Sequence, residues 1–238
     1  MAELALADRL RWRLTRDPRR QVLAALYVRG AAAFVVPAAI FKGGAWMLIW
    51  PALALVVVSF AYLGFGPRLF GKRPDGQIDW AMRLLLAPYL VAAWLNSRLW
   101  TRREPRMVEV VEGVWLGRFP SAADCRALSS VVDLTSECAR PDFAGDWTCL
   151  PMLDLVAPDV ASLAAAARAI ERARQRGPVL VCCALGYGRS VAALTVWLVR
   201  SGRCADVAAA LDYLRRLRPH MSLNDSQLRA VREAANAS

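Results

Sequence analysis

The segment VLVCCALGYGRS, residues 179–190, changes in character twice along its length. Apolar residues run into Cys182 and Cys183, and two glycines then bracket a tyrosine. Arg189 opens a second apolar run, which has helical periodicity and continues to Val199. This order predicts a β-strand, a tight loop and the start of a helix. The cysteine and the arginine, spaced as Cys-x5-Arg, would lie at the two ends of that loop.

A loop between a strand end and a helix start is suited to binding phosphate. Its backbone N–H groups point inward, and the helix dipole adds positive potential at the same place. Arg189 can bind two phosphate oxygens there, while Cys183 would lie under the phosphorus as a nucleophile whose thiolate the positive field favours. Glycines within the loop allow a close approach that a Cβ would obstruct. The expected phosphate-binding loop consists of Ala184, Leu185, Gly186, Tyr187 and Gly188.

The segment has a second interpretation, a buried strand followed by a glycine turn, because cysteine is often a core residue. Short motifs such as this spacing also match by chance. Here the strand before the motif, the glycines within it and the helix after it all agree. We therefore favour the phosphate-binding loop.

Cys183, Gly186, Arg189 and Ser190 resemble the loop of the dual-specificity branch of the cysteine-dependent phosphatases, His-Cys-x-x-Gly-x-x-Arg-Ser/Thr. The resemblance implies an α/β phosphatase domain, a phosphocysteine intermediate, and a role for Ser190 in the departure of the thiolate. Cys182 stands where that family usually has a histidine, which orients the loop and tunes the nucleophile. Rhodanese domains also end a strand in a cysteine loop closed by arginine, so they are the main alternative.

A general acid separates these two classes, because phosphomonoester cleavage leaves an alkoxide and sulfur transfer does not. The segment CLPMLDLVAPD, residues 149–159, is a short apolar strand that leads into a proline-bounded loop. It resembles the acid loop of the phosphatases, with Asp154 in the position of the acid. Asp154 could instead cap the helix that follows, but Asp159 is better placed for that role. Asp154 is therefore predicted to protonate the leaving group.

Charge is distributed unevenly along the 238 residues, whose net charge is +11 and whose mean hydropathy is +0.30. Residues 1–100 hold 13 Lys and Arg against 5 Asp and Glu, whereas residues 101–238 hold 18 against 15. Because the basic excess lies in the apolar half, we expect a lipid bilayer as partner and no nucleic acid. The single histidine and the lack of paired CxxC motifs indicate no metal site, and no cofactor is expected.

Two long apolar segments, residues 21–41 and 45–66, precede the phosphatase motifs. Each is about 20 residues long, enough to cross a hydrocarbon core of about 30 Å as a helix. The first contains Arg29 and Pro37, so it could instead be a buried core helix, whereas the second carries no charge. The connection between them is very short, and we therefore expect an antiparallel transmembrane hairpin over residues 21–66.

Basic residues flank both ends of this hairpin. A leader at residues 1–20 is rich in arginine, and Arg68, Lys72 and Arg73 follow the second segment. Cytoplasmic ends of membrane spans carry an excess of Lys and Arg, so both clusters are expected on one cytoplasmic face. The chain is thus predicted to be a multi-pass protein of the cell (inner) membrane with a cytoplasmic catalytic domain.

Residues 67–106 are expected to form a basic loop, an interfacial helix and a linker. Residues 84–95 within them are apolar, contain Trp94 and lie between Trp80 and Trp100. They are short for a membrane span and suit an interfacial or re-entrant helix, although a crossing by residues 80–100 is the alternative. The cysteine phosphatase domain is expected over residues 107–238 as an α/β sandwich that binds ligands at the carboxyl ends of its strands. A strand or a hairpin is expected over residues 108–116, and strands near residues 130–135, 147–153 and 177–182. Its helices are expected near residues 160–176, 190–201, 205–217 and 225–236.

A catalytic domain tethered at the bilayer meets lipid head groups at high effective concentration. We therefore expect a membrane-anchored phosphatase acting on a phospholipid monoester, such as a phosphatidylglycerophosphate-type lipid. Ala184, Leu185 and Tyr187 stand where polyphosphoinositide phosphatases of the resembled family carry lysines, which disfavours a highly charged head group. A protein phosphorylated on Tyr, Ser or Thr is the alternative substrate. A non-catalytic pseudophosphatase that binds phosphoryl groups is the alternative function.

Overall fold

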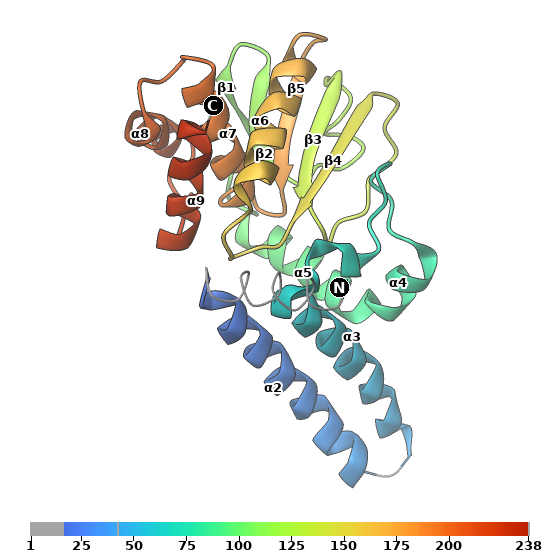
Figure 1. Ribbon diagram of the computed structural model, residues 1–238. Coiled ribbons are helices and arrows are strands. Elements are labelled where there is room, and N and C mark those ends of the chain that lie inside the picture. Colours follow the sequence, from blue (N-terminus) through green and yellow to red (C-terminus); the bar gives the residue numbers. More distant parts are fainter. Residues whose placement is uncertain (1–16, 42, 238) are drawn as a thin grey trace, which may run out of the picture.

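The computed structural model describes residues 17–41 and 43–237 of the chain. A helical hairpin forms one end of the molecule and an α/β domain with a five-stranded sheet forms the other, with further helices between them (Figure 1). Most of the basic leader expected over residues 1–20 lies outside the described residues.

The hairpin consists of two apolar arms that run side by side (Figure 1). The first arm is α2 (Arg19–Ile40), which continues through Pro37. The second arm passes from the 3₁₀ helix η1 (Gly44–Leu48) through α3 (Ile49–Phe60) to the π-helical turn η2 (Ala61–Phe65). Both arms are long and apolar enough to cross a membrane, by length and composition.

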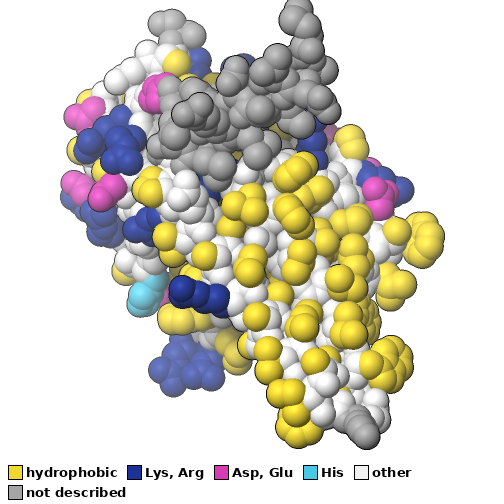
Figure 2. Space-filling model, turned by 60° about the horizontal axis from the view of Figure 1, so that its bottom comes forward, with side chains coloured by type: hydrophobic (Ala, Val, Ile, Leu, Met, Phe, Trp, Pro, Cys, Tyr) yellow, Lys and Arg dark blue, Asp and Glu magenta, His cyan; other side chains and the backbone are white. Residues whose placement is uncertain are grey.

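Little of the hairpin surface is covered by the rest of the molecule. Only 11% of the apolar window of the first arm is buried, and 39% of that of the second. The two arms approach closely at Gly30, where a Cβ would lie 3.1 Å from Cδ1 of Leu55. Figure 2 shows hydrophobic side chains gathered over this end of the molecule. An unusually apolar outer surface is therefore left facing away from the protein.

Three short helices connect the hairpin to the α/β domain. They are η3 (Pro67–Phe70), α4 (Trp80–Leu85) and α5 (Ala87–Trp100). The apolar segment expected as one interfacial helix over residues 84–95 is thus divided in two. The break lies at Leu86, directly before the first turn of α5, where Pro88 has no N–H with which to continue a preceding helix.

Lys72 lies in the connection between η3 and α4, and it is buried rather than part of an exposed basic patch. Its Nζ is 2.5 Å from Oδ2 of Asp133, and both side chains are 0% exposed. It also donates to the carbonyl and the hydroxyl oxygen of Thr135, at 2.8 Å each. The expectation of a patch formed by Arg68, Lys72 and Arg73 is therefore wrong for Lys72, because a carboxylate in the sheet draws it inward.

The sheet has the strand order β1-β2-β5-β3-β4, in which β1 is antiparallel to β2 and the other neighbours are parallel. The central strand, β5, is buried along its whole length, as is typical of an apolar strand between parallel neighbours. The strands are β1 (Met107–Val111), β2 (Val114–Arg118), β3 (Ser130–Thr135), β4 (Asp146–Met152) and β5 (Val179–Cys183).

Helices cover one face of the sheet and loops cover the other. Val179 and Val181 pack with the helices, whereas Leu180 and Cys182 pack with Phe119 under the loops, as the alternation of a strand requires. This arrangement confirms the predicted α/β fold. The four helices of the domain are α6 (Val160–Arg174), α7 (Arg189–Arg200), α8 (Val207–Leu217) and α9 (Asp225–Asn236).

Candidate active site

The loop between β5 and α7 packs directly against the end of β2. Gly186 has φ 79°, and a Cβ there would lie 2.7 Å from the backbone of Gly117, so only glycine fits. Gly188 has φ −115°, and a Cβ there would meet no protein atom closer than 3.7 Å. The fold itself therefore requires the first glycine and not the second.

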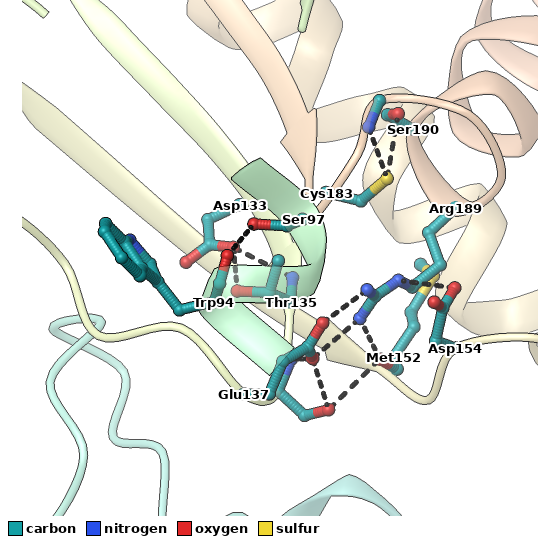
Figure 3. A network of polar contacts seen from close by, with 12 residues as sticks. Trp94, Ser97, Asp133, Thr135, Glu137, Met152, Asp154, Cys183, Arg189 and Ser190 are labelled. Carbon is teal, nitrogen blue, oxygen red and sulfur yellow. Dashed lines mark hydrogen bonds and ion pairs between the residues drawn. The ribbon is translucent and has the colours of Figure 1, made fainter. Parts of the chain in front are cut away.

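Cys183 is the last residue of β5, and its side chain is directed into this loop (Figure 3). The backbone N–H of Gly186 donates to Sγ of Cys183 at 3.2 Å. The hydroxyl of Ser190, in the first turn of α7, lies 3.3 Å from the same sulfur. Two hydrogen-bonding groups thus converge on the sulfur at the N-terminal end of α7.

Arg189 is fully buried, and a carboxylate holds its guanidinium in place (Figure 3). Nη1 donates to Oε2 of Glu137 at 2.9 Å, and Nη2 donates to Oε1 at 2.5 Å. Nη1 also donates to the carbonyl oxygen of Met152 at 3.0 Å. Nε makes no hydrogen bond within the described residues and lies 3.4 Å from Oδ1 of Asp154. Glu137 and the Met152 carbonyl therefore hold the two terminal nitrogens of the guanidinium, while Nε faces Asp154.

The pair of Arg189 and Glu137 is ionised at neutral pH. Burial raises the pKa of Glu137, but the charge of Arg189 and its hydrogen bonds lower it more, to about 2 from 4.5. Burial lowers the pKa of Arg189, but Asp154 and Glu137 raise it well above its ordinary value. Arg189 therefore remains charged, and the carboxylate of Glu137 balances that charge.

Sequence reasoning missed Glu137, although a signal for it was present. The residue follows the end of β3, and β3 pairs with β5 in parallel, so both strands end at the same edge of the sheet. Charged residues directly after such strands belong to the ligand-binding edge of an α/β fold. The position directly after a parallel strand, which pointed to the loop after Cys183, could therefore have pointed to Glu137 as well.

Asp154 lies in the loop that follows β4, here defined as the 153–158 loop. Its side chain is 33% exposed, whereas the flanking Leu153 and Val156 are buried. Asp159 occupies the N-cap position of α6, as expected, which leaves Asp154 outside the helix. The structure thus brings Asp154, Arg189, Cys183 and Ser190 together at the carboxyl ends of β4 and β5 (Figure 3).

The predicted phosphate-binding loop is also held from the C-terminal side. Arg218 is fully buried, and its Nη2 donates to the carbonyl oxygen of Leu185 at 3.0 Å. Its guanidinium lies over the ring of Tyr187, 5.2 Å from the centroid, and the carbonyl oxygen of Tyr187 accepts from the N–H of Ser222. These contacts to Leu185 and Tyr187 hold the middle of the loop and use none of its backbone N–H groups.

Cys182, which stands where the resembled family has histidine, lies on the opposite side of β5 from Cys183. It is 0% exposed and pairs in register with Asp133. Burial is the main cause that raises the pKa of its thiol well above the ordinary value. Cys182 is thus a neutral core residue, and the polar groups beside it are the buried pair of Asp133 and Lys72.

Within the described part of the chain, no three His, Cys, Asp or Glu side chains gather as metal ligands would. The chemistry available at the site is that of a sulfur nucleophile, a buried cation, a hydroxyl and a carboxyl group. That set is suited to the transfer of a phosphoryl group to sulfur and then to water.

Comparison with known proteins agrees with this geometry. The model of the dual specificity phosphatase catalytic domain matches residues 114–237. Tk-PTP in its active form is 26% identical, with a TM-score of 0.50, over 56% of this chain and 97% of that chain. Human DUSP28 is 26% identical, with a TM-score of 0.46, over 56% of this chain and 97% of that chain. PTPMT1 in complex with PI(5)P is 16% identical, with a TM-score of 0.49, over 55% of this chain and 95% of that chain. The search of curated proteins gave no match.

The chain therefore belongs to the dual specificity phosphatase family. It is a phosphoester hydrolase of the wider protein tyrosine phosphatase superfamily, and the rhodanese alternative is set aside. The matched region begins at Val114, so the hairpin, the connecting helices and β1 all lie outside it.

Proposed function

We propose that the chain is a membrane-anchored cysteine phosphatase that hydrolyses phosphomonoesters through a phosphocysteine intermediate. The observation that carries this proposal is the convergence on one site of the Cys183 sulfur, the oriented Arg189 and Asp154. The inward N–H groups of residues 184–188, together with Arg189, would hold the equatorial oxygens of the phosphoryl group.

The reaction has two steps. The thiolate of Cys183 attacks phosphorus in line, the bond to the leaving oxygen breaks, and Asp154 gives its proton to that oxygen. A water molecule then attacks the phosphocysteine, the sulfur–phosphorus bond breaks, and inorganic phosphate leaves. Ser190, 3.3 Å from the sulfur, would donate a hydrogen bond to the departing thiolate.

The hairpin is proposed to cross the cell (inner) membrane. Two arms of 22 residues each, with exposed apolar surfaces, fit the thickness of a bilayer. The catalytic domain is proposed to be cytoplasmic, because basic residues flank the hairpin in the sequence: the arginine-rich residues 1–20 come before it, and Arg68 and Arg73 follow it. Trp80, Leu84 and Trp100, on α4 and α5, are exposed apolar side chains that suit the membrane interface.

A phospholipid monoester is the proposed substrate, and the position of the site relative to the hairpin supports it. The hydroxyl of Tyr62, in η2 at the end of the second arm, donates to the carbonyl oxygen of Asp154 at 3.2 Å. Arg20, at the start of the first arm, donates to the carbonyl oxygen of Ala157. A phosphate on a lipid would thus need to leave the interface very little to reach Cys183.

The decisive measurement is phosphate release by the full-length protein in detergent, with EDTA and a reductant present. The substrates are a short-chain lipid phosphate and peptides that carry phosphotyrosine or phosphoserine. Cys183→Ser should abolish turnover of every substrate that the wild type hydrolyses, and the lipid phosphate should be preferred. Preference for a peptide would favour a phosphoprotein substrate instead. A folded protein without turnover on any of them would favour the pseudophosphatase that Cys182 suggests.

A further inference from the structure

The 153–158 loop has a backbone conformation that its own sequence does not stabilise. Leu155, directly after Asp154, has φ 62°, and it is the only residue other than glycine with a positive φ in the described part of the chain. A branched side chain in the left-handed region costs on the order of 1 kcal/mol, and such a conformation persists only where its surroundings impose it. The contacts around this loop therefore determine where Asp154 points.

Residues of the matched phosphatase region hold one side of the loop. Asn224 donates from Nδ2 to the carbonyl oxygen of Leu155 at 3.0 Å. Gln227 donates from Nε2 to the carbonyl oxygen of Val156 at 3.4 Å. Both belong to the capping box at the start of α9, so the loop is tied to a rigid helix end on this side.

Residues of the hairpin hold the other side. The Tyr62 hydroxyl donates to the carbonyl oxygen of Asp154 itself. Asp17 is buried, and its Oδ2 accepts from the N–H of Ala157 at 2.6 Å. These residues all lie before Val114, outside the matched phosphatase region.

Apolar packing shows the same division. Leu153 and Val156 do not belong to the core under α6–α9, but to a separate cluster formed with the hairpin. That cluster also contains buried hairpin residues, among them Val58 and Tyr62, and Tyr62 is 2% exposed. Two apolar residues of the loop, Leu153 and Val156, are thus buried in a cluster that they share with the hairpin, while Leu155 between Asp154 and Val156 is exposed.

We infer that the hairpin is part of the catalytic apparatus, and that Tyr62 is a positioning residue that sets Asp154 for proton donation. This inference rests on the proposed role of Asp154 as general acid. The anchor then couples assembly at the bilayer to the acid step, because the hydroxyl reaches Asp154 only when η2 is packed on the loop. The phosphate-binding loop, which Arg218 and β2 hold, does not depend on the hairpin in this way.

Leaving groups of different basicity test the inference. An aryl phosphate, p-nitrophenyl phosphate, releases a stable phenolate and needs little protonation, whereas an alkyl phosphate, the short-chain lipid phosphate, needs the acid. In the full-length protein, Tyr62→Phe should lower kcat on the alkyl phosphate about 2- to 10-fold, the effect of one hydrogen bond. Its kcat on the aryl phosphate and both KM values should remain close to wild type.

Three further variants give the comparison its controls. Asp154→Asn should lower kcat on the alkyl phosphate about 10²- to 10⁴-fold, far more than on the aryl phosphate. Combining it with Tyr62→Phe should cause no further loss, because the two residues act in one step. Tyr213→Phe removes a matched hydroxyl, which donates to the carbonyl oxygen of Val110 away from the 153–158 loop, and it should affect both substrates equally.

The outcomes separate the inference from the function on which it rests. Loss of activity in Asp154→Asn that is equal on the two substrates would overturn the acid assignment and the inference with it. The inference alone would be overturned if Asp154→Asn behaved as expected while Tyr62→Phe lowered kcat equally on both substrates or on neither. Additive losses in the double variant would do the same.

Discussion

Arg189 takes its orientation from Glu137, a residue that contributes no atom to the sequence motif. Both terminal nitrogens of the guanidinium bond to that carboxylate, and the pair is excluded from water. A buried ion pair of this kind adds little net stability, yet removing one partner leaves an uncompensated charge. The arrangement thus holds the guanidinium in one orientation.

Glu137→Ala should lower the free energy of unfolding by about 3–5 kcal/mol, because it leaves Arg189 buried without its counter-ion. It should also lower turnover on aryl and alkyl phosphates alike, since phosphate binding is common to both. Denaturant unfolding of the detergent-solubilised protein measures the first effect. Glu112→Ala, an exposed position, is the control and should stay within about 0.5 kcal/mol of wild type.

The same pair gives the protein a pH dependence of defined sign. The pKa of Glu137 is about 2 in the folded protein against 4.5 ordinarily, because Arg189 outweighs the effect of burial. A lowered folded pKa contributes stability that is complete above 4.5 and is lost as the pH falls towards 2. The melting temperature should fall over that interval, and Glu137→Gln should flatten the fall. An unchanged slope in Glu137→Gln would contradict this assignment.

At the scale of elements, the connection between η3 and α4 is joined to the sheet through one lysine. Lys72 inserts its ammonium group between Asp133 and Thr135 at the end of β3, and Trp147 donates to the same carboxylate. Burial lowers the pKa of Lys72, but Asp133 together with Cys149 and Cys138 raises it above its ordinary value, so the lysine remains charged. The connection that follows the hairpin is therefore joined to the α/β domain by a buried ion pair, in addition to the contacts of the hairpin with the 153–158 loop.

Lys72→Met should destabilise the protein by about 3–5 kcal/mol, because Asp133 would remain buried without its partner. The neighbouring Arg73→Met is the matched control, since Arg73 pairs with Asp75 where both side chains are about half exposed. Exposed pairs contribute about 0–1 kcal/mol, so that variant should be nearly neutral. Equal losses of stability in the two variants would show that the buried Lys72–Asp133 pair contributes no more than an exposed pair.

At the scale of the whole molecule, the hairpin meets the α/β domain at one end of the sheet (Figure 1). The candidate site residue Asp154 lies at this junction, where it contacts both Tyr62 and Arg189. The apolar outer surface of the hairpin extends away from that junction (Figure 2). If the arms cross a bilayer, the candidate active site lies at its surface and not at the far end of the domain.

Membrane fractionation tests this arrangement directly. The full-length protein should remain with the membranes after an alkaline carbonate wash, which removes peripheral proteins, because two buried spans resist extraction. Leu53→Asp, at an exposed position on the second arm, should reduce that retention, since a carboxylate in the hydrocarbon core costs several kcal/mol. Release of the wild type by carbonate would contradict the transmembrane assignment.

The sequence alone determined the features that depend on local pattern. Apolar runs and their periodicity placed the strands, the domain helices and the two apolar arms, and β3 has the bounds expected for it. The spacing of Cys183, Gly186 and Arg189 identified the loop, because strand, loop and helix follow one another directly along the chain. Local propensity could also locate Asp154 outside the helix, since Asp159 already occupies the cap.

Only the tertiary structure decided which distant residues complete the site. Glu137 bonds to Arg189 across 52 positions of sequence, Lys72 to Asp133 across 61, and Tyr62 to Asp154 across 92. No periodicity relates such residues, because their contact depends on which strands are neighbours and on where the hairpin packs. Each is buried by that packing, and a buried polar group must find its partner there. Local sequence was therefore enough to predict Cys183 and its loop, whereas the residues that contact Arg189 and Asp154 depend on the tertiary fold.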